Sequence, residues 1–131
     1  MKTATIALLK SELDTMPATE LVSLCARLAR FKKENKELLT YLLFEAHDTE
    51  AYIKSVIQEM DSNFETINKS NAYFVKKTLR KILRITHKFI RYSGSDIVAT
   101  ELLIHFCKTV KKMDKSITTN QVIINIYQNQ L

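Results

Sequence analysis

Apolar residues recur at steps of three and four along most of the chain, which is the spacing of one face of an α-helix. The clearest runs predict helices over residues 17–31, 49–67, 72–92 and 97–113, and a weaker run predicts a first helix over 3–13. The apolar positions behind the four clear helices are Leu21, Leu24, Cys25, Leu28 and Phe31; Tyr52, Ile53, Val56, Ile57, Met60, Phe64 and Ile67; Val75, Leu79, Ile82, Leu83, Phe89 and Ile90; and Val98, Leu102, Phe106, Val110 and Met113.

A further helix is predicted over residues 33–46, where the pattern is different. Six of the seven residues from Leu38 to Phe44 are apolar or aromatic, and they cover almost every direction around the helix axis. A helix that is apolar all round is typically buried on several sides. We therefore expect this helix at the centre of the domain.

The C-terminal segment, residues 117–131, is rich in β-branched residues but is predicted to be a docked helix. Ile123, Tyr127 and Leu131 share a four-residue step, as do Val122 and Ile126. A strand here would have no other strand with which to pair.

Turn residues are scarce, because Gly94 and Pro17 are the only glycine and the only proline. Strand-rich folds need such residues at most turns, whereas helices joined by short connections do not. Pro17 is tolerated in the first turn of a helix, and Gly94 is expected to end a helix in the left-handed conformation. The expected N-caps are Asp48, either Ser70 or Asn71, and Asp96.

These patterns predict an all-α fold of six to seven helices in antiparallel hairpins. Two arrangements fit, a compact helical bundle and a short right-handed α–α superhelix, and no repeat of fixed period selects the superhelix. The 131 residues are expected to form a single domain, with residues 1–14 as a loosely attached first helix.

The cellular location is predicted from the cysteines and the N-terminal residues. Cys25 and Cys107 are flanked by apolar residues and are expected to be reduced, buried thiols. The apolar run from Ile6 to Leu9 is too short for a signal sequence or a transmembrane segment. We expect a cytoplasmic protein.

The charge of the chain is concentrated in one predicted helix. The net charge is +6, yet residues 66–95 contain eight basic residues and no acidic one. The rest of the chain carries 12 basic and 14 acidic residues. On a helical wheel of about 100° per residue, the basic side chains lie opposite the apolar ones. The candidate partner- or phosphate-binding residues of this basic face are Tyr73, Lys76, Lys77, Arg80, Lys81, Arg84, Lys88 and Arg91.

Three interpretations of the basic face remain open. It holds an acidic protein surface (or an anionic membrane surface), it binds nucleic-acid backbone without sequence preference, or it is neutralised internally by the acidic region over residues 37–65. An acidic protein partner ranks first, because Tyr73 is the one aromatic residue within the basic arc and Lys outnumbers Arg by 15 to 5.

The sequence argues against the common kinds of catalytic and metal site. A single glycine excludes the glycine-rich loops that cradle phosphates, and two cysteines with three histidines at unpaired spacing exclude structural zinc. Glu101 and His105, four residues apart, are interpreted as a surface ion pair. No catalytic residue, metal ligand or cofactor is predicted, and the expected class is a non-enzymatic interaction module of undetermined oligomeric state.

Overall fold

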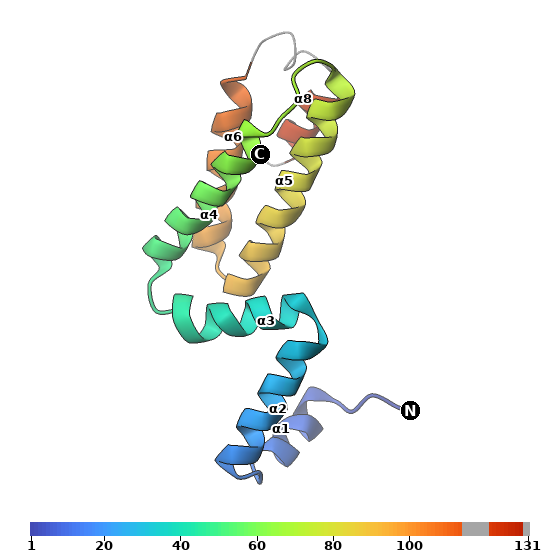
Figure 1. Ribbon diagram of the computed structural model, residues 1–131, viewed down its shortest axis with the longest axis vertical. Coiled ribbons are helices and arrows are strands. Elements are labelled where there is room, and N and C mark those ends of the chain that lie inside the picture. Colours follow the sequence, from blue (N-terminus) through green and yellow to red (C-terminus); the bar gives the residue numbers. More distant parts are fainter. Residues whose placement is uncertain (114–120, 130–131) are drawn as a thin grey trace. The chain divides into compact units, whose positions relative to one another are not determined.

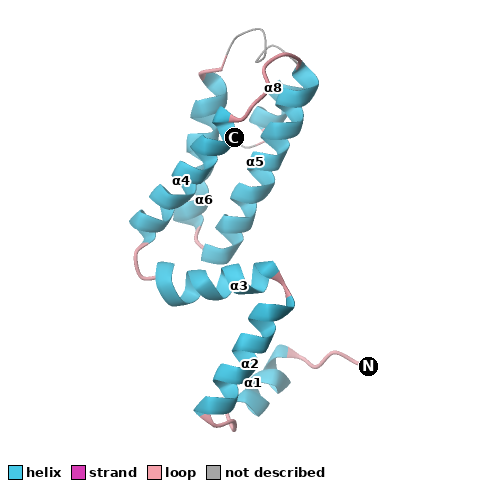
Figure 2. Ribbon diagram, viewed as in Figure 1, coloured by secondary structure: helices cyan, strands magenta, loops and turns pink. Residues whose placement is uncertain are grey.

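The computed structural model describes residues 1–113 and 121–129, which contain seven α-helices, one π-helical turn and no strand (Figures 1 and 2). The all-α prediction is confirmed. The elements are α1 (Ile6–Leu13), α2 (Ala18–Phe31), α3 (Lys33–Thr40), η1 (Tyr41–Glu45), α4 (Thr49–Glu65), α5 (Ala72–Ser93), α6 (Asp96–Lys111) and α8 (Gln121–Gln128). Expectations that concern residues 114–120, 130 and 131 lie outside the described residues.

The chain divides into two compact units, Met1–Thr40 and Tyr41–Leu131. The expectation of a single domain over residues 1–131 stays a prediction.

The second unit is built around an antiparallel bundle of α4, α5 and α6. These three helices run up, down and up beside one another in Figure 1, and α8 packs against α5. The connections between them are short. Six residues join α4 to α5, and two residues join α5 to α6, which is typical of antiparallel neighbours. This unit therefore has the first of the two expected arrangements, the compact bundle.

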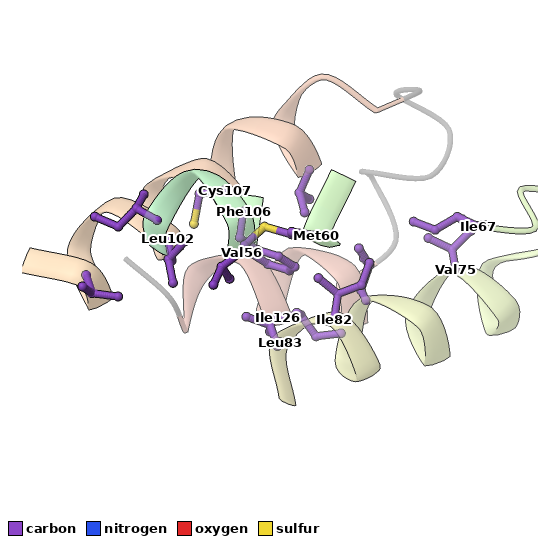
Figure 3. Close-up of a cluster of buried hydrophobic side chains, with 14 of the residues drawn as sticks. Val56, Met60, Ile67, Val75, Ile82, Leu83, Leu102, Phe106, Cys107 and Ile126 are labelled. Carbon is purple, nitrogen blue, oxygen red and sulfur yellow. The ribbon is translucent and has the colours of Figure 1, made fainter. Parts of the chain in front are cut away.

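The core of the bundle lies where the apolar faces of its helices meet (Figure 3). Val75, Leu79, Leu102 and Phe106 are completely buried. Burial of each such side chain contributes about 1.5–3 kcal/mol relative to leaving it in water. The apolar faces predicted for these three helices are confirmed.

One polar side chain, Thr86, is buried with the apolar ones. Its hydroxyl donates a hydrogen bond of 2.8 Å to the carbonyl of Ile82, one turn earlier in the same helix. This bond offsets the cost of removing the hydroxyl from water.

The helix ends follow the predicted capping residues with one correction. Asp48 caps α4, Asn71 rather than Ser70 caps α5, and Gly94 ends α5 with a φ of 58°. The predicted N-cap Asp96 is wrong by one residue, because the hydroxyl of Ser95 accepts the hydrogen bond from the Val98 amide. Asp96 is instead the first helical residue, where its charge complements the helix dipole.

The expectation that the helix over residues 33–46 is central and buried is wrong. The α-helix gives way at Tyr41 to the π-helical turn η1, in which the Ala46 amide donates to the Tyr41 carbonyl at 2.9 Å. Tyr41 packs against the core, with its ring 4.7 Å from that of Tyr52, whereas Leu42, Leu43 and Phe44 are exposed. A helix that is apolar all round is buried only where other helices surround it. The core of the second unit is formed mainly by α4, α5 and α6, so Leu42, Leu43 and Phe44 of η1 are not enclosed.

The first unit contains no buried side chain among its 40 residues, all of which are described. Helices α2 and α3 contact each other, and the Asn35 side chain donates a 2.8 Å hydrogen bond to the Leu28 carbonyl near the end of α2. The apolar face predicted for residues 17–31 is present but not buried. Cys25, expected to be buried, is exposed for the same reason.

The tail prediction is confirmed over Gln121–Gln128, which forms α8. Ile126 is buried in the core, so α8 is docked as expected. The side chains of Ile123, Tyr127 and Leu131 lie outside the described part of the chain.

Candidate interaction surface

Helix α5 positions the candidate residues, and its own sequence fixes where it begins and ends. The Asn71 side chain accepts hydrogen bonds from the amides of Tyr73 (2.7 Å) and Phe74 (3.2 Å). Gly94 ends the helix, which is 22 residues long. The apolar face of α5 is buried in the core of the bundle. The opposite face of α5 therefore points away from that core.

That opposite face carries the predicted site residues. Lys77, Arg80, Lys81, Arg84 and Arg91 are exposed, and Lys76 and Lys88 are half-buried. We call these seven residues together with Tyr73 the basic face of α5. His87 is also exposed on this helix.

The N-terminal half of the basic face lines a half-open hollow of about 630 Å³. Tyr73 is exposed beside it, and the Lys76 ammonium lies 5.7 Å from the centre of the Tyr73 ring. Such a cation–π contact holds the ring and the charge together. The residues that line the hollow are Tyr73, Lys76, Lys77, Thr78, Arg80, Lys81 and Arg84.

The structure thus brings six of the eight predicted site residues around the hollow, and the other two lie further along α5. The Lys88 ammonium lies 5.4 Å from the centre of the Phe89 ring. Arg91 is exposed in the last turn, where a cation complements the helix dipole. The sequence pattern does not distinguish Lys88 and Arg91 from the six predicted residues that line the hollow.

Like charges adjoin one another along this face. Lys77 precedes Lys81 by four residues, and Arg80 precedes Arg84 by the same step. Each like-charged pair destabilises a helix by about 0.2–0.5 kcal/mol. Among the residues that the structure describes, no carboxylate forms an ion pair with these four side chains.

The acidic residues of α4 are not engaged with this face. Glu50, Glu59 and Glu65 are exposed, and Asp61 forms a 2.7 Å contact between its Oδ1 and Nε2 of His105 on α6. The predicted pairing of His105 with Glu101 is therefore wrong. The true partner is 44 residues away in sequence, so no local spacing could have identified it.

The remaining chemistry-bearing groups are dispersed. Cys25 and Cys107 are both free thiols, and burial raises the pKa of Cys107 above its ordinary value. Within residues 1–113 and 121–129, no three His, Cys, Asp or Glu side chains are grouped so that they could hold a metal ion. No helix in the described part of the chain has the length and apolar character needed to cross a membrane.

No protein-family model, curated protein or solved structure matches the chain.

Proposed function

We propose that the chain is a non-enzymatic helical interaction module of the cytoplasm, in which the basic face of α5 holds an acidic segment of a protein partner. One observation carries the proposal. Arg80, Lys81 and Arg84 are exposed together around a hollow, and no carboxylate of the described residues pairs with them. An external carboxylate would relieve their mutual repulsion.

The character of the hollow favours a protein over a nucleic acid. The Tyr73 ring and the methylene stems of the lysines provide apolar surface beside the charges, which suits apolar side chains that flank acidic ones. A nucleic-acid groove normally offers several aromatic rings on which successive bases stack. The hollow contains one aromatic ring.

The test is a fluorescence-anisotropy titration with a Glu- and Asp-rich peptide, its Gln- and Asn-substituted counterpart, and random-sequence single- and double-stranded DNA and RNA. The variant R80E/K81E/R84E removes the charges around the hollow. The matched control K32E/K33E/K36E makes the same change in net charge at three exposed lysines of the first unit. We expect the acidic peptide alone to bind at about 150 mM salt, and only the α5 variant to lose this binding.

Two other results would replace the proposal. Tighter binding of nucleic acid, with a log–log salt slope of about −4 or steeper, would assign the face to phosphates. A lower melting temperature for the α5 variant, with no ligand bound by the wild type, would show that the acidic region over residues 37–65 neutralises the face internally.

A further inference from the structure

The first unit presents an apolar surface that its own residues do not bury. Domains below about 40 residues rarely gain a sufficient core alone and usually depend on disulfides, metals or association. This unit has 40 residues and no buried side chain. Its apolar side chains therefore lack the burial that would stabilise its helices.

Helix α2 carries the most regular part of this surface. Leu24, Leu28 and Phe31 follow one another at steps of four and three, which places them in one stripe along the helix. Leu28 is 54% exposed and Phe31 is 76% exposed. Leu21, one turn before Leu24, is half-buried at the edge of the same stripe.

Two opposite charges flank this stripe on one side. Glu20 and Arg27 lie about 80° and 100° from Leu28 on the helical wheel, in the direction of Leu24 and Phe31. Both side chains are exposed, and neither is in an ion pair within the described residues. They are seven residues apart, about 10 Å along the axis, so they do not pair within one helix.

An antiparallel pair of α2 helices would cover the apolar stripe and would also pair Glu20 with Arg27. In a twofold antiparallel pair, residues on the same flank of the two helices face each other. The midpoint between Glu20 and Arg27 lies between Ser23 and Leu24, and so does the midpoint between Met16 and Phe31. A twofold axis at this point places each Glu20 opposite an Arg27, brings the two Leu24 side chains next to each other, and sets Leu28 and Phe31 opposite Thr19 and Met16 of the second copy.

We propose that the chain forms a homodimer in which α2 packs antiparallel against α2 of a second copy. Leu24 lies next to the twofold axis, and Leu28 and Phe31 cover the start of α2 of the second copy. Glu20 of each copy pairs with Arg27 of the other at the two ends of the contact. This inference is independent of the basic face of α5.

The test measures the mass of the full chain by analytical ultracentrifugation over a range of concentrations. The wild type should sediment at about twice the 15.2 kDa of one chain. L24E/L28E should sediment as a monomer. The matched control I97E/I104E, which makes the same change at two exposed apolar residues of α6, should remain a dimer.

Charge reversal tests the antiparallel arrangement itself. E20R and R27E should each weaken dimerisation by about tenfold, because each creates two like-charged contacts across the axis. The double variant E20R/R27E should recover the wild-type affinity.

Three results would overturn the proposal. The first is a wild type that is monomeric at about 100 μM, which would mean that the stripe is covered within one chain or by another protein. The second is a dimer that persists in L24E/L28E. The third is a double reversal that fails to restore the dimer.

Discussion

The hydroxyl of Tyr52 on α4 donates a hydrogen bond of 2.7 Å to the backbone carbonyl of Phe89 on α5. Tyr52 is 5% exposed, so this bond is partly shielded from water and favours one axial alignment of the two helices. The Tyr41 ring also packs against the Tyr52 ring, with 4.7 Å between the ring centres.

Removal of this hydroxyl should destabilise the bundle without loss of apolar contact. Tyr52→Phe keeps the ring and leaves the carbonyl without its cross-helix donor, so the free energy of unfolding should fall by about 1 kcal/mol. Urea unfolding followed by circular dichroism measures the change. Tyr73→Phe removes the same atom from an exposed ring and should leave stability unchanged, and an equal loss in both variants would contradict the assignment.

The core position of Phe106 predicts a larger effect. Phe106 is completely buried, with its ring 5.7 Å from that of Phe64. Phe106→Ala should lower the free energy of unfolding by about 3–5 kcal/mol, because it leaves a cavity among close-packed neighbours. Phe44→Ala, at a ring that is 66% exposed, is the matched control and should cost less than about 0.5 kcal/mol. Similar losses in the two variants would mean that η1 is covered and contributes to a core.

Helix α5 should depend on one capping side chain. Asn71→Ala leaves the amides of Tyr73 and Phe74 without their acceptor and should cost about 1 kcal/mol. Ser70→Ala, one residue earlier, should have no measurable effect on the melting temperature. A greater loss from the Ser70 variant would show that the helix begins one residue earlier than described.

The buried thiol of Cys107 should be protected in the folded protein. Burial raises the pKa of Cys107, because a thiolate is poorly solvated in an apolar environment. The stabilisation from this neutral thiol is complete below the unfolded pKa of about 8.5 and is lost as the pH rises through the higher folded value.

Thiol titration with a disulfide reagent in a Cys25→Ser background follows Cys107 alone. At pH 8 we expect the native protein to react at least about tenfold more slowly than the urea-unfolded chain. The Cys107→Ser variant reports the exposed Cys25 as the reference. Equal native and unfolded rates for Cys107 would show that it is accessible.

The sequence predicted α5 almost completely, because the evidence for that helix is local. Its apolar and basic residues separate on a wheel, so burial of Leu79 and exposure of Arg80 follow from helical geometry alone. Asn71 and Gly94 mark its ends by capping chemistry that acts within a few residues. The external or internal neutralisation of the basic face is a separate question, which the binding experiments address.

The errors concern contacts that helical periodicity does not encode. A pattern shows which face of a helix is apolar, but not whether enough chain surrounds it, so Leu28 and Phe44 were expected to be buried. The change to a π-helical turn at Tyr41 has no simple residue signature. Asp61 and His105 meet because α4 and α6 are neighbours, which no spacing within either helix reveals.

The hydroxyl of Thr86 is satisfied within its own helix, whereas the contact between Asp61 and His105 joins two helices. This difference has an evolutionary consequence. Position 86 can change to valine or serine without a compensating change on another helix, since the Thr86 hydroxyl bonds only within its own helix. Positions 61 and 105 are epistatic, because a change in either one removes the partner of the other. Among homologous sequences we therefore expect covariation between positions 61 and 105 and independent variation at position 86.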